Sequence, residues 1–293
     1  MTAARMTGLR TAVKDATDRL AVAGVASPEH DARARAVHVL GLARPSDLLM
    51  LDELDERQVS AFDVLVSRRA ERVPLQHLTG SVGFRHLELE VGPGVFVPRP
   101  ETESVVQYAV DALQAVPAPL CVDLCTGSGT IALALANELP GAVVHAVERD
   151  PDALEWARRN AASRVRAGDP AVRLHRGSAE QALPGHDGTV DLVISNPPYV
   201  ATTEADVSDP EVLDHDPGIA LWAGEDGLDG IRLVELAARR LLKPGGLLVV
   251  EHSDRQDRSA PELLESAGGW TDVADHRDYA GRDRYVTARR ALA

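Results

Sequence analysis

Residues 120–132, LCVDLCTGSGTIA, form an apolar segment that runs directly into a glycine-rich turn. Small residues allow the backbone to turn sharply there and to approach a ligand closely, and the last small position lets a helix pack on the strand. Turns of this kind occur in many folds, so the turn alone leaves ligand binding and simple tight packing equally open. The segment predicts a strand, a turn and a helix in direct succession.

Strand and helix patterns alternate on both sides of this segment, over residues 99–293. Strands are predicted at 120–124, 142–147, 172–176, 190–195, 247–252, 270–275 and 284–289. Helices are predicted at 101–115, 130–139, 151–163, 228–242 and 259–267. Several of the strands are almost entirely apolar, which is typical of parallel strands covered on both faces. We therefore predict an α/β, Rossmann-like domain with a mostly parallel seven-stranded sheet, in which Pro244-Gly245-Gly246 is a simple turn.

The chain before this domain has a different character. Residues 1–75 are predicted to form a small helical bundle, with a helix starting at Ser27-Pro28. A later segment carries apolar residues at helical spacing: Val59, Phe62, Val66 and Ala70. Glycines and prolines punctuate residues 76–98, where the alternation LELEV predicts a hairpin linker. The bundle contains no catalytic constellation, so it is either a stabilising cap or a recognition module for a macromolecular substrate.

Composition excludes several classes of protein. Asp plus Glu number 45 against 31 Lys plus Arg, giving a formal net charge of −14, whereas duplex-binding proteins usually show a basic footprint. Nucleic acid is therefore not expected as a direct substrate. No stretch approaches the roughly 20 apolar residues of a membrane span, and the N-terminus lacks the apolar core of a secretory signal. We expect a cytoplasmic protein with no membrane association.

The cysteines and histidines do not suggest a metal site. The two cysteines, Cys121 and Cys125, lie within one apolar run, and no histidine cluster completes a set of four ligands. His86, His215 and His252 show no mutual metal spacing. We predict that the protein binds no metal.

Two carboxylates extend the glycine-rich pattern toward a nucleoside site. Glu148 ends the next strand, close to the offset of about 20 residues at which an acidic side chain accepts ribose hydroxyls. Asp123 lies within an apolar strand, where an unpaired carboxylate would be costly, so it faces either cationic groups of a cofactor or backbone amides of the turn. From this half of the domain alone, two alternatives remain open. Glu148 could be a solvated carboxylate at the end of a strand, and the protein could be a dinucleotide-binding enzyme.

The most specific motif is Asn196-Pro197-Pro198-Tyr199, which follows the apolar strand 190–195. Two prolines fix the backbone, so the carbonyl directions of the loop are set in advance. An amide nitrogen is a poor nucleophile because its lone pair is delocalised into the carbonyl group. If the Asn196 oxygen and the Pro197 carbonyl hold its two protons, the nitrogen can become tetrahedral and direct its lone pair at a sulfonium methyl. Tyr199 would lie against the planar group and exclude water.

These motifs resemble those of the PrmC/HemK family of protein-(glutamine) methyltransferases, and the resemblance spans nearly the whole chain. Further segments that look like the family are Arg72-Val73-Pro74-Leu75-Gln76, residues 96–103 (FVPRPETE), Gly224-Glu225-Asp226-Gly227-Leu228, Glu251-His252 and residues 278–283 (DYAGRD). The resemblance implies a class I S-adenosylmethionine-dependent methyltransferase that modifies the GGQ-loop glutamine of class-I peptide chain release factors. The helical region 1–75 would then help to dock the release factor.

The resemblance also implies roles for individual residues. The residues expected to bind S-adenosylmethionine are Asp123, Cys125, Thr126, Gly127, Ser128, Gly129, Glu148 and Asn196. Asn196, Pro197 and Tyr199 are expected to be catalytic, and with Pro198 they would bind the acceptor glutamine. Phe96 would lie near the site of methyl transfer as part of a lid, whereas the residues alone favour a simple helix start at 96–103. Cys125 departs from the family, which usually has glycine at this position.

Three other functions stay open. An adenine-specific DNA or RNA methyltransferase uses the same chemistry on an exocyclic amine. The acceptor could also be a glutamine of a ribosomal protein, and a non-catalytic protein could keep the fold as a scaffold. The acidic segment Glu204–Asp216 is long enough for a lid over the acceptor and is equally compatible with solvated surface.

Overall fold

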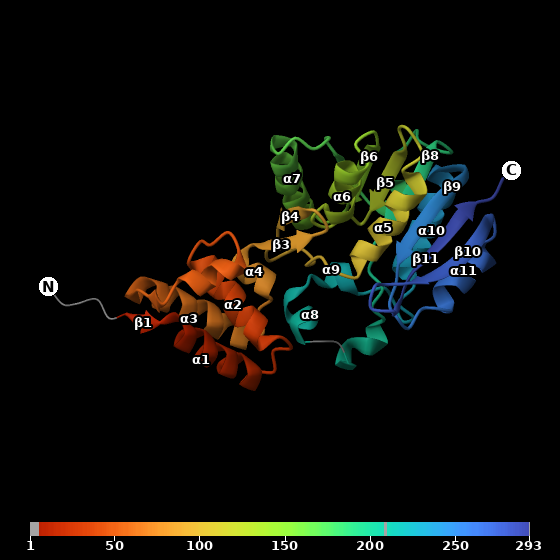
Figure 1. Ribbon diagram of the computed structural model, residues 1–293. Coiled ribbons are helices and arrows are strands. Elements are labelled where there is room, and N and C mark those ends of the chain that lie inside the picture. Colours follow the sequence, from red (N-terminus) through yellow and green to blue (C-terminus); the bar gives the residue numbers. More distant parts are fainter. Residues whose placement is uncertain (1–5, 208–209, 293) are drawn as a thin grey trace. The chain divides into compact units, whose positions relative to one another are not determined.

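The computed structural model describes residues 6–207 and 210–292, which fold into two compact units (Figure 1). One unit is formed within residues 1–81 and 209–215, and the other within residues 82–208 and 216–293. Among the described residues, no helix is both long and apolar enough to span a bilayer.

The first unit is mainly helical. Its helices are α1 (Leu9–Val22), α2 (Pro28–Val39), the 3-10 helix η1 (Pro45–Met50), α3 (Glu56–Ala70), α4 (Leu75–Thr79) and α8 (Pro210–His215). Two short strands, β1 (Thr7–Gly8) and β2 (Glu53–Leu54), pair antiparallel. The predicted apolar face of α3 lies in the core, where Phe62 and Val66 are buried against α1 and α2.

The helix starts differ in how they are capped. α2 begins at Pro28 as predicted, but the Ser27 side chain makes no capping hydrogen bond. α3 has a full capping box, in which Asp55 accepts from the Gln58 amide at 2.8 Å and the Gln58 side chain accepts from the Asp55 amide at 2.9 Å. The sequence D-x-x-Q at this position carries the signal that identifies the start of α3.

The second unit contains the predicted seven-stranded sheet, in the order β10-β11-β9-β8-β5-β6-β7. The strands are β5 (Leu120–Leu124), β6 (Val143–Glu148), β7 (Arg173–Arg176), β8 (Val190–Ser195), β9 (Leu242–Glu251), β10 (Trp270–Arg277) and β11 (Asp283–Arg290). Strands β5 to β9 run parallel, whereas β11 pairs antiparallel with both β9 and β10. The mostly parallel, Rossmann-like fold is confirmed.

Helices cover both faces of this sheet. They are α5 (Thr102–Leu113), α6 (Thr130–Glu138), α7 (Pro151–Arg166), α10 (Asp229–Leu241) and α11 (Ser259–Ala267). Because neighbouring strand residues point to opposite faces, Cys121 packs with α5 and α6 while Val122 and Leu124 pack with α10 and α11. Alternation along β5 therefore directs Asp123 toward the α6 side.

The connecting segments contain most of the differences from prediction. The hairpin forms from β3 (Ser81–Phe84) and β4 (Leu87–Glu90), but it is preceded by α4. Strand β9 starts at Leu242, so Pro244-Gly245-Gly246 is an irregularity within a strand and not a turn before it. The segment Glu204–Asp216 includes the end of η3 (Thr202–Val207) and α8, with α9 (Gly218–Leu221) after it, while residues 208 and 209 lie outside the described part.

Candidate active site

The predicted site residues meet at one edge of the sheet, where the parallel strands end. In the register of the sheet, Leu124 at the end of β5 lies beside Val147 of β6 and Ser195 of β8. Ser195 in turn lies beside Val250 of β9, and its hydroxyl donates to the Leu124 carbonyl at 2.6 Å. The glycine-rich turn, Glu148 and the loop 196–199 therefore leave the same edge, which is where ligands bind in sheets of this type.

The glycine-rich turn uses left-handed backbone conformations. Cys125, Gly127 and Gly129 have φ of 59°, 56° and 87°. A β-carbon at Gly129 would approach Leu133 Cδ1 to 3.2 Å, whereas one at Gly127 would meet nothing within 4 Å. Cys125 is strained by about 1 kcal/mol because its side chain disfavours this region, which explains why glycine suits the position. The space beside Gly127 is open.

Glu148 is tied to the turn through backbone amides. Its Oε2 accepts from Gly127 N at 2.9 Å, and its Oε1 accepts from Arg149 N at 2.8 Å and Asp150 N at 2.9 Å. The side chain is buried. A carboxylate has about four lone-pair positions, so one acceptor site remains beyond these three bonds.

Asp123 is buried beneath the turn and forms hydrogen bonds to the turn and to α6. Its Oδ2 accepts from the Thr126 hydroxyl and, at 3.1 Å, from Ala132 N of α6. Complete burial raises the pKa of Asp123 to about 7, even though these two hydrogen bonds lower it. In this conformation Asp123 therefore contacts a side-chain hydroxyl of the turn and a backbone amide of α6.

The Asn196 side chain has a defined orientation. Its Nδ2 donates to Thr102 Oγ1, at the start of α5, at 3.3 Å. Because the nitrogen is used in this way, the oxygen Oδ1 is the group left for an external donor. Pro197 is buried, and Pro198 and Tyr199 are half-buried.

The start of α10 and the segment before it support the loop 196–199. A β-carbon at Gly230 would come within 2.2 Å of the Pro198 carbonyl oxygen, and one at Gly227 within 2.6 Å of the Tyr199 carbonyl oxygen. The buried Gln256 donates to the same Tyr199 oxygen at 3.3 Å and to the Gly227 oxygen at 3.0 Å. Only glycine allows this close approach at positions 227 and 230. We call the three supporting residues, Gly227, Gly230 and Gln256, the loop brace.

Phe96 is half-buried and held by its neighbours. The Arg99 guanidinium lies 4.8 Å from the centre of the Phe96 ring and pairs with the buried Asp216 at 2.6 Å. Asp216 also accepts from Val97 N at 3.4 Å. The segment before α5 is therefore fixed by Asp216, which the sequence did not single out.

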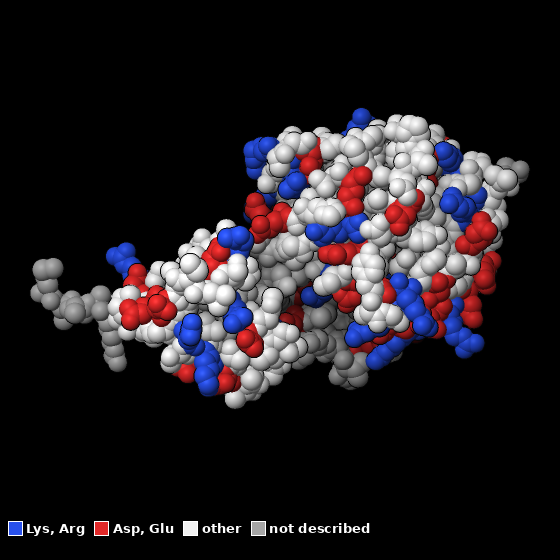
Figure 2. Space-filling model, viewed as in Figure 1, with Lys and Arg blue, Asp and Glu red and all other residues white. Residues whose placement is uncertain are grey.

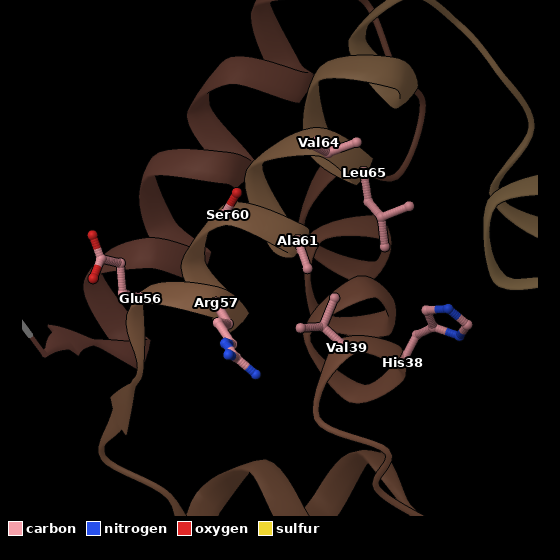
Figure 3. A pocket seen from close by; sticks show the side chains of 8 residues that line it. All are labelled: His38, Val39, Glu56, Arg57, Ser60, Ala61, Val64 and Leu65. Carbon is pink, nitrogen blue, oxygen red and sulfur yellow. The ribbon is translucent and has the colours of Figure 1, made fainter. Parts of the chain in front are cut away.

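A pocket of about 900 Å³ lies in the first unit, between α2 and α3 (Figure 3). It is lined by His38, Val39, Glu56, Arg57, Ser60, Ala61, Val64 and Leu65, and contains none of the predicted site residues. Among the described residues, no group of three or more His, Cys, Asp or Glu side chains is arranged to hold a metal ion. The features that suggest chemistry thus lie at the sheet edge of the second unit.

Comparison with known families and proteins matches both parts of the chain. Residues 11–80 match the PrmC N-terminal domain, and residues 120–284 match a methyltransferase domain. The release factor glutamine methyltransferase of Streptomyces coelicolor is 52% identical over 96% of this chain and 97% of its own length. That of Mycolicibacterium smegmatis is 49% identical, with 97% and 99% covered.

The chain belongs to the release factor glutamine methyltransferase family. A third member, from Deinococcus radiodurans, is 42% identical over 97% of this chain and 99% of its own length. Among solved structures, the hMettl16 catalytic domain in complex with a MAT2A 3′UTR hairpin aligns with a TM-score of 0.55. It is 14% identical and covers 70% of this chain and 75% of that one, which supports the methyltransferase fold alone.

Several residues that shape the site in this family member were given no role of their own from the sequence, although Thr102 lies in the family-like segment 96–103. Thr102 lies in the first turn of a helix, Gly230 inside a helix, and Gln256 in a connecting segment. A glycine in a helical pattern gives one indication, since it costs about 1 kcal/mol relative to alanine and needs a packing reason. The other two contacts depend on tertiary structure.

Proposed function

We propose that this protein transfers a methyl group from S-adenosylmethionine to the side-chain amide nitrogen of the GGQ glutamine in class-I peptide chain release factors, and so supports translation termination. The observation that carries the proposal is the position of Asn196-Pro197-Pro198-Tyr199 beside the glycine-rich turn at one sheet edge, in a chain of this family. A scaffold protein would not need the loop 196–199, which we call the acceptor loop. We place the reaction in the cytoplasm.

The residues at the sheet edge fit S-adenosylmethionine. The open space beside Gly127 and the positive φ angles of the turn allow a ligand to approach the backbone of residues 125–129 closely. Glu148 is held at this turn and keeps one acceptor site for ribose hydroxyls. Asp123 would act through the turn, and Asn196 would contact both ligands. The cofactor supplies an electrophilic methyl group on a cationic sulfur.

Catalysis would depend on positioning and hydrogen bonding. Asn196 Oδ1 and the Pro197 carbonyl would accept the two amide protons of the glutamine, which favours a tetrahedral nitrogen with its lone pair exposed. Thr102 already holds Asn196 Nδ2, so the oxygen is oriented before the acceptor arrives. Tyr199, Pro198 and Phe96 would enclose the planar amide, and the product would lose its extra proton to water.

The helical first unit would contribute to docking of the release factor. It carries the family's N-terminal domain over residues 11–80. None of the predicted catalytic or cofactor-binding residues lies in it. A protein acceptor larger than one side chain needs a second contact surface, whereas a small-molecule acceptor does not. We therefore assign this unit to substrate recognition.

Charge distribution favours a protein acceptor over a nucleic acid. The chain has a net charge of −14, and Figure 2 shows acidic and basic side chains interspersed on the visible face of each unit. A nucleic-acid methyltransferase would need enough clustered Lys and Arg to neutralise several phosphates. A ribosomal-protein glutamine would suit the same acceptor loop, so it is included in the test.

The test is a methyl-transfer assay with purified protein and methyl-labelled S-adenosylmethionine. The acceptors are full-length release factor, its variant with Ala in place of the GGQ glutamine, ribosomal proteins and duplex DNA. We expect label on the native release factor only. Equal label on the alanine variant, or preferential label on DNA or a ribosomal protein, would refute the substrate assignment.

A further inference from the structure

Glu251 is a buried carboxyl group next to the acceptor loop. It is the last residue of β9, and β9 lies beside β8, from which the loop 196–199 continues. Its exposed fraction is only 1%, and its Oε2 has no hydrogen-bond partner among the described residues. Burial of an acid with an unused oxygen is costly, so the position calls for a specific role.

Two hydroxyl groups face this carboxyl group. Burial raises the pKa of Glu251 to about 7, while the neighbouring Thr102 hydroxyl, the charge of Arg284 and the Tyr199 hydroxyl oppose this rise. Thr102 holds the Asn196 side chain, and Tyr199 is the last residue of the loop 196–199. Glu251 is therefore placed beside one residue of α5 and one residue of the loop 196–199, without being part of the loop.

The direction of the hydrogen bonds follows from the Asn196 contact. Thr102 Oγ1 accepts from Asn196 Nδ2, so the Thr102 proton must point to another acceptor. An ionised carboxylate has lone pairs for both hydroxyl protons, whereas a protonated carboxyl group must itself donate. With Glu251 ionised, Thr102 can donate its proton to Glu251 while it accepts from Asn196, and Tyr199 can act as a second donor.

We propose that Glu251 is the positioning residue of the acceptor loop: its carboxylate orients Asn196 through Thr102 and fixes the Tyr199 ring. This inference rests on the proposed function, because the amide that Asn196 would hold is the acceptor glutamine. Glu251 touches neither acceptor nor cofactor in this scheme and acts through its two hydroxyl partners.

The scheme gives the reaction a dependence on pH. The charged and titratable groups facing Glu251 from other elements are Tyr199 of the acceptor loop, Arg284 of β11 and Glu101 before α5. Arg99 faces Tyr199, and Asp278 pairs with Arg284 at 3.4 Å. Protonation of Glu251 reverses one hydroxyl bond, so kcat should fall as the pH is lowered through about 7.

The test compares Glu251→Gln, Thr102→Val and Thr102→Ser with wild type. Glutamine keeps the shape but offers one acceptor oxygen, so we expect kcat to fall about ten- to hundredfold and its rise between about pH 6 and pH 8 to disappear. Affinity for S-adenosylmethionine should stay within about twofold, because the turn is untouched. Thr102→Val should lower kcat similarly and non-additively with Glu251→Gln, whereas Thr102→Ser should restore it.

The matched control is Glu235→Gln, which alters a buried glutamate whose partners are Trp270 Nε1 at 3.0 Å and Arg239 at 3.3 Å. It should keep the kcat and the pH profile of wild type. Unchanged kcat and pH profile in Glu251→Gln, or additive effects of the two substitutions, would overturn the inference.

A second measurement does not depend on turnover. In nitrogen-15-labelled protein, the side-chain amide signals of Asn196 should titrate with a midpoint near pH 7, and this titration should vanish in Glu251→Gln. Signals that do not titrate in wild type would refute the role of Glu251. Absence of label on the release factor with a normal Asn196 titration would refute the proposed function alone.

Discussion

Asn196 shows how one contact assigns the two ends of an amide to different tasks. Its nitrogen is bound to Thr102, and its oxygen is thereby presented as an acceptor. An unbound asparagine side chain would rotate between these orientations. Fixing it on binding the acceptor would cost conformational entropy and so reduce the net stabilisation. The fixed orientation is therefore what makes this side chain suitable for stabilising a transition state.

Replacement of Asn196 by alanine should separate binding from chemistry. We expect the variant to bind S-adenosylmethionine with near-normal affinity, while kcat falls about 10²- to 10³-fold, as for loss of one preorganised polar group at a reaction centre. Isothermal titration and single-turnover methyl transfer measure the two quantities. Asn137 of α6 provides the control: Asn137→Ala removes a 2.9 Å bond to Asp169 and should leave turnover near that of wild type. A turnover of Asn196→Ala equal to that of wild type would refute the assigned role.

The beginning of α10 acts on the acceptor loop through the absence of a side chain. Gly230→Ala should increase helix propensity by up to about 1 kcal/mol, so any loss of function must come from contact with the loop. A β-carbon only 2.2 Å from the Pro198 oxygen must displace it, and displacement of reactive groups by about 1 Å can cost up to 10²-fold in rate. We expect kcat to fall at least about tenfold in a methyl-transfer assay.

Gly83→Ala is the comparison for this change, because a β-carbon there meets nothing within 4 Å and the residue has no positive φ. It should leave kcat unchanged. If both alanine variants turned over like wild type, the brace would not control the geometry of the loop.

Helices α2, α3 and α8 share a group of charges in which Arg69 and Asp31 are buried and Glu211 is half-buried. Arg69 of α3 pairs with Asp31 of α2 and with Glu211 of α8, each at 2.7 Å. Arg69→Ala leaves the buried Asp31 without this partner, so we expect a loss of about 3–5 kcal/mol of unfolding free energy. Urea denaturation of the full chain, followed by circular dichroism, measures the loss.

The exposed pair Arg33–Glu29, at 3.5 Å on the surface of α2, provides the control. Arg33→Ala should cost at most about 1 kcal/mol. Equal losses for the two arginine variants would show that burial of the Arg69 group has no special effect.

Elements with a regular apolar period were predictable, and contacts between distant segments were not. The strand–turn–helix at 120–132 and the acceptor strand 190–195 carry their signals locally, so both were placed correctly. Helix α8 is too short for a period, and its role depends on Arg69, far away in the sequence. The same holds for Thr102, whose neighbour Asn196 lies 94 residues further on.

Buried ionisable groups make stability depend on pH in the second unit. The pKa of Asp123 is raised to about 7 by burial, from about 4 in an unfolded chain. The folded state thus holds its proton more tightly. The contribution of this group to stability is complete below about pH 4 and is lost as the pH rises through about 7. His145 acts in the opposite sense, because burial lowers its pKa to about 4 and its contribution is lost as the pH falls below about 6.5.

Asp123→Asn isolates the first of these effects. Relative to wild type, this variant should gain stability as the pH is raised from about 5 to about 8, because asparagine never becomes charged. Thermal denaturation of both proteins at the two pH values gives the comparison. Asp254→Asn, an exposed change, should show no such trend. A pH-independent difference between Asp123→Asn and wild type would contradict the assignment.

The helical unit is built from two segments that are far apart in the sequence, which affects its folding during synthesis. During synthesis, residues 6–81 leave the ribosome first, with Arg69 and Asp31 already present. Glu211 follows only after strands β5 to β8 have been translated, which at about 5–20 residues per second takes many seconds. Throughout that interval the Glu211 carboxylate is not yet available to pair with Arg69 in the nascent bundle. The N-terminal part of the chain reaches its final form only after the strands that carry the acceptor loop have emerged.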